Sequence, residues 1–311
     1  MNYSVLIVTP PGYPHSQCFN EVADTICDGL KSLGYEAAIT TVVRPGTRHI
    51  VLGSHLLVDH PLALPADSIL YNLEQLAGNP FFSSPAFYAL LRRYAVWDYA
   101  QDNLSALAAQ GVRAQALLPI GYYEGLTRIA PSATKDIDVL FIGSTNDRRQ
   151  NALAAMDAAG LQVVSLFNKY GAERDAFIAR SKLLLNVHFY PAKILEQVRI
   201  SYYLANKVAV LSELSSNDAV DTDWGRGICA VPYEQLVTEA VRLCRDDVAR
   251  ADLCRRGFAF IKERSIVPHL KAALEATTIP QLSEPAASLR RNDPCHCGSG
   301  KRFKHCHGTG L

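Results

Sequence analysis

Short apolar runs alternate with segments of helical periodicity from residue 3 to residue 118. The opening run YSVLIV is uniformly hydrophobic, and the apolar positions of residues 16–33 recur every three to four residues up to Gly34. Uniformly apolar strands separated by helices are typical of a parallel sheet covered on both faces. The pattern therefore predicts an α/β domain with strands at 3–8, 36–42, 48–52, 68–71, 94–97 and 114–118 and helices at 16–33, 84–93 and 101–110.

A second series with the same alternation begins after Asp136. It predicts strands at 137–142, 161–167, 183–187, 207–211 and 227–231, helices at 147–159, 172–181 and 195–206, and largely helical structure over 233–276. A segment near 119–135 that contains Pro and Gly joins the two series. We expect an α/β fold of two Rossmann-like domains, 1–125 and 133–275, that face each other across a cleft. In such sheets, ligands bind at the carboxyl ends of the strands.

The C-terminal segment has a different pattern. Residues 276–291 hold two prolines and many small polar residues, which predicts a flexible linker. Residues 292–311 contain three of the eight cysteines within a stretch too short to bury a hydrophobic core. We therefore expect a small metal-stabilised knuckle at 292–311.

Composition narrows the class of protein further. With 311 residues the chain has room for two domains and an appendage, and its net charge of +1 gives no global field that points to nucleic acid or an anionic membrane. No apolar run reaches the roughly 20 residues that span a bilayer. The N-terminus has no basic stretch followed by a cleavage site, so we expect no signal peptide and a cytoplasmic location.

The spacing of the terminal cysteines predicts a zinc site. Cys295 and Cys297 are separated by one residue, and Cys306 and His307 follow after a turn that contains Gly298. Three thiolates and an imidazole suit the tetrahedral coordination of zinc, and four protein ligands close the site, so we expect one structural Zn²⁺ per chain. His296 and His305 are alternative ligands that we rank lower.

This tail resembles the SEC-C motif, the zinc-binding end of the preprotein translocase ATPase SecA. The resemblance covers residues 290–309 and the pattern NDPC-x-CGSG-x-x-[FY]-K-x-CHG, with Phe303 and Lys304 at two of its positions. In SecA this element contacts the export chaperone and the ribosome. By analogy, the resemblance implies that the tail docks on a protein partner or a ribosome.

Candidate phosphate-binding residues follow the first strand of the second series. Gly143, Ser144, Thr145 and Asn146 form a turn that opens a helix, and free backbone amides at a helix N-terminus attract a phosphate. A plain helix cap is the alternative interpretation of this turn.

Further candidates follow the strand at 183–187. Asn186, His188 and Tyr190 are expected to point toward the cleft, although a structural role is the alternative for His188. Glu196 and Arg199 share one face near the start of the next helix. A carboxylate there suits ribose or sugar hydroxyls, and a guanidinium suits a diphosphate. An exposed ion pair within the helix is the alternative for Glu196 and Arg199.

The stretch 136–265 resembles the C-terminal half of the GT-B glycosyltransferases. The resemblance rests on IGSTNDRR after a strand, on NVHFY, LEQVR and YYLANKVAVLSE, and on the closing helices. It implies a GT-B fold, a nucleotide-diphosphate sugar as donor and chemistry that requires no active-site metal. Many retaining members carry two glutamates seven residues apart around this helix. Glu196 can stand for one, but the other position falls on Tyr202 or Tyr203.

An inverting enzyme of this fold also needs a general base that faces the acceptor. The loop PPGYPHSQCFNE after the first strand makes His15 and Glu21 the first candidates, and Glu74 and Asp98 are further ones. Simple solvation of His15 and a helix N-terminal charge for Glu21 are the alternatives.

The sequence thus predicts a glycosyltransferase that moves a sugar from a nucleotide-diphosphate donor to an acceptor. A protein, peptide, lipid or small molecule could all serve as that acceptor. A catalytically silent GT-B adaptor, which binds a ribosome, chaperone or other protein through the zinc tail, is one alternative. A nucleotide-sugar epimerase is another.

Overall fold

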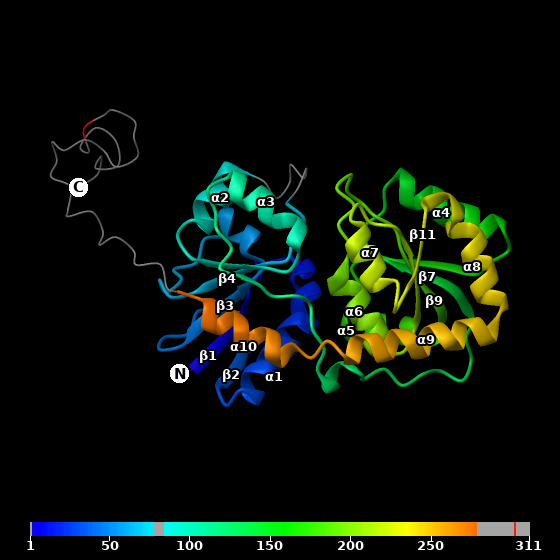
Figure 1. Cartoon of the computed structure of the whole chain (residues 1–311), viewed down its shortest axis with the longest axis horizontal. Helices are drawn as coiled ribbons and strands as arrows, with labels where there is room; N and C mark the ends of the chain where they lie inside the picture. The colour runs from blue at the N-terminus through cyan, green and yellow to red at the C-terminus, as the bar shows by residue number, and fades with distance from the viewer. Residues whose placement is uncertain (1, 77–83, 279–301, 303–311) are drawn as a thin grey trace. The chain divides into compact units, whose positions relative to one another are not determined.

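The computed structural model describes residues 2–76, 84–278 and Arg302, and it divides the chain into two units, 1–278 and 279–311. The first unit contains two α/β domains, each built on its own parallel sheet (Figure 1). The expected fold class of two Rossmann-like domains is therefore confirmed. The predicted zinc ligands Cys295, Cys297, Cys306 and His307 lie outside the described residues.

The sheet of the first domain has the strand order β2-β1-β3-β4-β5-β6, with all neighbours parallel. Its strands are β1 (Asn2–Ile7), β2 (Glu36–Thr40), β3 (Arg48–Leu52), β4 (Ile69–Asn72), β5 (Ala95–Asp98) and β6 (Ala116–Leu117). Its helices are η1 (Pro14–Phe19), α1 (Asn20–Ser32), η2 (Ser54–Val58), α2 (Pro85–Leu91) and α3 (Gln101–Ala109). The predicted helix 16–33 is thus a 3₁₀ turn that starts at Pro14, followed by an α-helix.

The sheet of the second domain has the order β11-β10-β9-β7-β8, again parallel throughout. Its strands are β7 (Ile137–Ile142), β8 (Val163–Leu166), β9 (Ser181–Asn186), β10 (Ala209–Glu213) and β11 (Cys229–Val231). Its helices are α4 (Asp147–Ala158), α5 (Gly171–Arg180), α6 (Gln197–Ala205), α7 (Asp218–Trp224), α8 (Leu236–Arg245) and α9 (Asp247–Lys262). Helix α7 was not predicted, because its short acidic sequence lacks an apolar repeat; the Asn217 side chain caps it by accepting from two backbone amides.

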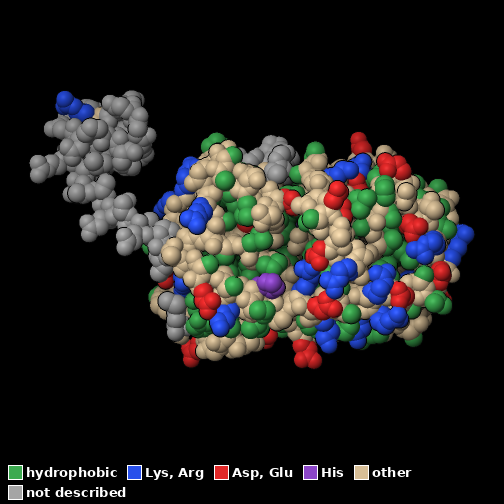
Figure 2. Space-filling view, in the orientation of Figure 1, with side chains coloured by type: hydrophobic (Ala, Val, Ile, Leu, Met, Phe, Trp, Pro, Cys, Tyr) green, Lys and Arg blue, Asp and Glu red, His purple; other side chains and the backbone are tan. Residues whose placement is uncertain are grey.

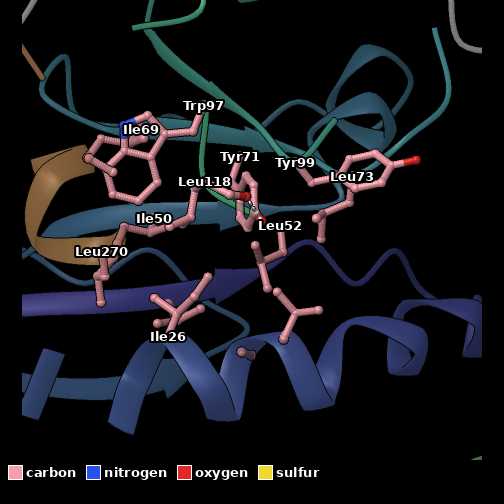
Figure 3. Close-up of a cluster of buried hydrophobic side chains, with 14 of the residues drawn as sticks. Ile26, Ile50, Leu52, Ile69, Tyr71, Leu73, Trp97, Tyr99, Leu118 and Leu270 are labelled. Atoms are coloured by element: carbon pink, nitrogen blue, oxygen red, sulfur yellow. Dashed lines mark hydrogen bonds between the residues drawn. The ribbon is translucent and has the colours of Figure 1, made fainter. Parts of the chain in front are cut away.

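Aliphatic side chains, with a few large aromatic ones, fill the core of the first domain (Figure 3). Tyr71 on β4 and Trp97 on β5 meet edge to face with ring centroids 6.3 Å apart. The Tyr71 hydroxyl donates to the backbone oxygen of Leu118 at 2.6 Å, so its burial leaves no polar atom unsatisfied. Leu73 and Tyr99 lie at one end of this core, beyond the carboxyl ends of β4 and β5.

The last described helix, α10 (Ile266–Ala276), returns to the first domain and packs against α1 (Figure 1). Ile266 and Leu270 belong to the first-domain core, where Gly29 of α1 permits the close approach: a Cβ at Gly29 would lie 2.9 Å from Ile266 Cγ2. The indole N–H of Trp97 donates to the Thr277 hydroxyl at 2.8 Å. Residues 266–275, which the sequence grouped with the domain 133–275, therefore complete the first domain instead, because the apolar face of α10 fits the groove beside Gly29.

Charged side chains of both signs are interspersed over the face shown in Figure 2, in keeping with the net charge of +1. Within residues 2–76 and 84–278, no helix combines the length and the apolar character that a membrane span requires.

Candidate functional site

A cavity of about 450 Å³ lies between the two domains of the first unit. Its walls come from segments that follow β1, β4, β7 and β8 and from the start of α6. The strand order reverses at β1 in one sheet and at β7 in the other, which is where ligands bind in open parallel sheets. The cavity therefore occupies the position that the sequence predicted for the binding cleft.

The Gly143 turn and Arg199 form the floor of this cavity. Gly143 follows β7 with φ +149, and a Cβ at this residue would lie 3.3 Å from Nη1 of Arg199. Glycine at this position thus leaves room for the guanidinium to lie over the backbone. Nη1 of Arg199 is buried and has no hydrogen-bond partner among the described residues. An unpaired cationic N–H in a cleft is suited to an anionic ligand.

A second arginine, Arg149 on α4, is buried beside the same turn. Its Nε donates to the Val187 oxygen at 2.8 Å, and its Nη1 donates to the Ser144 oxygen at 2.7 Å. Its Nη2 lies 3.5 Å from Glu196 Oε1. Burial, followed by the charge of Arg199, lowers the pKa of Arg149 to about 10. The two guanidinium groups therefore concentrate positive charge at one end of the cavity.

Glu196 precedes α6 and faces the cavity with three polar partners. Its Oε2 accepts from Asn186 Nδ2 at 2.8 Å and lies 3.0 Å from Nδ1 of His188. Burial alone raises the pKa of Glu196, but His188, Arg199 and Asn186 together outweigh burial and lower that pKa. For His188, burial favours the neutral ring, yet the carboxylates of Glu196 and Glu213 together outweigh burial and raise the pKa of His188. The pair is thus held in its charged form.

The predicted donor-binding residues fall into two groups. Gly143, Ser144, Tyr190, Glu196 and Arg199 line the cavity. The other four do not line it. Asn146 caps α4 by accepting from the amide of Arg149 at 3.0 Å, and Thr145 accepts from Gln150. Asn186 and His188 hold the Glu196 carboxylate. The structure thus brings most of the predicted residues together at one end of the cavity, and their role in donor binding stays a prediction.

His15, a predicted base, lies on η1 at the cavity wall. Its Nδ1 is 3.0 Å from the Tyr170 hydroxyl of the second domain. Its ring packs between those of Tyr13 and Phe167, with centroids 5.1 and 5.2 Å away. His15 therefore lies in a position to contact a ligand, and its role as a base stays a prediction.

Glu21, the other predicted base, lies in a network of ion pairs. Its Oε1 accepts from Arg128 and from Arg174, each at 2.8 Å. Both guanidinium groups also lie over the ring of Tyr202 on α6. Because these contacts join α1 to the second domain, they favour a structural role for Glu21 over proton transfer.

The remaining two base candidates differ sharply in position. Asp98 is fully buried, and its carboxylate accepts from the side chains of Asn72 at 2.7 Å and Asn103 at 3.0 Å. Glu74 lines the cavity next to His55, with Oε1 3.4 Å from His55 Nδ1. Burial raises the pKa of Glu74 to about 7. Sequence reasoning named Glu74 but ranked it below His15 and Glu21, because its loop carries no motif.

Solved structures with the same architecture are known. The chain is similar to Alr3699/HepE of Anabaena in complex with UDP and glucose, with a TM-score of 0.60 and 13% identity over 88% of this chain and 98% of that one. The fold is that of the GT-B glycosyltransferases. WaaG, a glycosyltransferase involved in lipopolysaccharide biosynthesis, has a TM-score of 0.53 and 11% identity over 89% and 99% of the two chains. At such identities the likeness establishes the GT-B fold alone.

Sequence relatives match parts of the chain. Uncharacterized protein L140 of Acanthamoeba polyphaga mimivirus is 26% identical over 200 residues, which are 61% of this chain and 63% of that protein. The chain therefore spans less than two thirds of the length of this relative. Residues 291–309 match the SEC-C motif. SecA of Aromatoleum aromaticum is 52% identical over 40 residues, which are 12% of this chain and 4% of SecA.

Proposed function

We propose that the chain is a glycosyltransferase that takes a sugar from a nucleotide-diphosphate donor bound in the interdomain cavity. The observation that carries the proposal is the buried Nη1 of Arg199, which lies against the glycine turn after β7 and has no hydrogen-bond partner in the part of the chain that the structure describes. Leaving such a donor unpaired is costly unless a ligand satisfies it. A diphosphate supplies both the acceptor oxygens and the negative charge.

The charge balance of the cavity supports a dianionic group. Arg149 and Arg199 lie close enough that each opposes the other's charge, and Glu196, the carboxylate nearest to Arg149, is already engaged by His188. In a transferase without an active-site metal, such cations stabilise the diphosphate as it leaves. The arrangement thus suits the departure of a nucleoside diphosphate.

The other lining residues can bind the rest of the donor. Glu196 lines the cavity and can accept from ribose or sugar hydroxyls, while Asn186 and His188 fix its carboxylate through Oε2. The side chains of Phe167, Tyr170 and Tyr190 add aromatic surface for a base or a sugar ring. UDP and glucose in the Anabaena HepE structure are consistent with this proposal.

Thermal shift with a panel of UDP-, GDP- and dTDP-sugars tests the donor site. At a concentration about 100 times Kd, one nucleotide family should stabilise the chain by about 2.7 kcal/mol, a rise in Tm of roughly 4 to 5 °C. Arg199→Ala should abolish the shift, and Arg226→Ala, which removes an exposed arginine, should preserve it. No shift with any nucleotide would favour the adaptor alternative, and an epimerised product would favour the epimerase.

For the tail we propose one structural zinc bound by Cys295, Cys297, Cys306 and His307. The donor set of three thiolates and one imidazole fits tetrahedral Zn²⁺. The match of residues 291–309 to the SEC-C motif supports this assignment. We further propose that the tail docks the enzyme on a protein partner or ribosome, which would bring the acceptor to the cavity.

A further inference from the structure

Opposite the arginines, the N-terminal domain presents two consecutive polar side chains on the loop after β4. Glu74 lines the cavity beside His55, and Gln75 donates through Nε2 to the backbone oxygen of Ile194 at 2.8 Å. Ile194 lies two residues before Glu196. The loop therefore spans the cleft and fixes Glu74 with respect to the donor side.

A buried polar cluster in the first domain holds this loop in place. The backbone oxygen of Glu74 accepts from the side-chain amides of Asn72 at 3.0 Å and Asn103 at 2.8 Å. Both asparagines donate to the buried carboxylate of Asp98, and Asn103 Oδ1 accepts from the Leu76 amide at 2.9 Å. Such preorganisation limits the motion of a side chain that acts on a substrate. It also explains why Asp98 is buried, although the sequence considered it as a base.

Four groups within residues 2–76 and 84–278 interact with Glu74 and carry no positive charge at neutral pH. Those whose charge interacts with Glu74 include Tyr13, Cys18 and Tyr99, and His55 is in contact with it. Burial raises the pKa of the two tyrosines and the cysteine and lowers the pKa of His55 to about 4, so all four are uncharged at neutral pH. The Glu74 carboxylate is therefore poised to gain a proton.

Glu74 also lies near the donor end of the cavity. Cys18 is close enough to Glu74 and to Arg199 that it interacts with the charge of each. Tyr99 likewise interacts with both Glu74 and Glu196. The loop after β4 and the start of α6 thus face one common space, which a sugar between the two domains would occupy.

We propose that Glu74, positioned against His55, is the base that removes the proton from the acceptor hydroxyl. This inference rests on the proposed function. As the acceptor O–H bond breaks, its proton goes to the Glu74 carboxylate, and the oxygen forms a bond to the anomeric carbon. The bond between that carbon and the diphosphate oxygen breaks, and its electron pair leaves with the diphosphate beside Arg199. The attack comes from the face opposite the diphosphate, so the anomeric configuration inverts.

Because water can take the place of the acceptor and hydrolyse the donor, the base can be tested without the natural acceptor. The full chain is incubated with UDP-glucose, or with the sugar nucleotide of the panel that stabilises it most, and release of the nucleoside diphosphate is measured. Glu74→Gln should lower the rate about 100-fold near pH 8 without weakening nucleotide binding in thermal shift. Glu263→Gln, which changes an exposed glutamate, should have no effect.

Two further readouts separate a base from a structural residue. The wild-type rate should rise with pH through about 7, and this dependence should disappear in Glu74→Gln. Formate should restore release to Glu74→Ala, since it can replace the missing carboxylate.

Each adverse result is assigned to one proposal. Unchanged release by Glu74→Gln, retention of the anomeric configuration, or nucleotide binding by the wild type without release would overturn this inference and leave the donor site standing. Failure of the wild type to bind any nucleotide would instead overturn the proposed function.

Discussion

The Arg199 guanidinium lies against Gly143, and a Cβ at Gly143 would lie 3.3 Å from Nη1 of Arg199. This contact joins the turn after β7 to helix α6, two elements that are far apart in sequence. It explains in physical terms why a glycine occupies the position.

Gly143→Ala should weaken nucleotide binding and destabilise the fold. At φ +149 an added side chain costs on the order of 1 to 3 kcal/mol, and it also pushes the guanidinium away. Gly160→Ala is the matched control, since Gly160 has φ +83 but nothing within 4 Å of the added Cβ. Calorimetric titration should show weaker binding for Gly143→Ala alone. Equal binding by both variants would argue against the contact as a ligand site.

Glu21→Gln should destabilise the chain by about 1 to 3 kcal/mol, because Arg128 and Arg174 both lose the negative charge of Glu21, although Asp175 still pairs with Arg174. Asp24→Asn should cost less than about 1 kcal/mol, since Asp24 and Arg128 form a more exposed pair. Denaturant unfolding measures both changes. If Glu21 is structural, its variant should still bind nucleotide at temperatures below its Tm. A folded variant that binds nucleotide normally but no longer catalyses the reaction would restore the catalytic prediction for Glu21.

Glu74 should make stability fall as the pH rises from about 4.5 to about 7. Its folded pKa of about 7 exceeds the ordinary value of 4.5, so in this window the folded state binds more protons than the unfolded state. Glu74→Gln should therefore raise the free energy of unfolding near pH 8 by on the order of 1 to 3 kcal/mol, and with it Tm. Near pH 4 the substitution should change both quantities little. A Tm difference that does not vary with pH would contradict the raised pKa.

Truncation after Leu289 should remove one zinc per chain, as measured by elemental analysis of the purified protein. The wild type should contain one equivalent, and Cys306→Ser should lose most of it, because three ligands bind structural zinc far less tightly than four. The unit 1–278 should keep its melting temperature in the truncated chain. Zinc retained by the truncated chain would refute the ligand assignment.

The sequence predicted the parts of the structure that depend on local patterns. The strand IDVLFI and the Gly143 turn are read from consecutive residues, and the spacing of Glu196 and Arg199 places both at the start of one helix. The return of α10 to α1 could not be read in this way, because it depends on a groove at Gly29 formed by residues more than 200 positions earlier.

The roles of individual site residues depend on such distant contacts as well. The sequence makes Glu21 a base candidate, but in the structure Arg128 and Arg174 pair with its carboxylate. Asn72 and Asn103 fix the loop of Glu74, and Gln75 joins this loop to the second domain, which favours Glu74 as the base. None of these pairings follows from the spacing of residues in one chain.

The most direct test of the donor site is a crystal structure of the chain with the nucleoside diphosphate that stabilises it. The account predicts the diphosphate within hydrogen-bonding distance of Arg199 Nη1, above the Gly143 turn, with Glu196 facing the ribose or the sugar. A nucleotide bound elsewhere, with Arg199 Nη1 still unpaired, would contradict it.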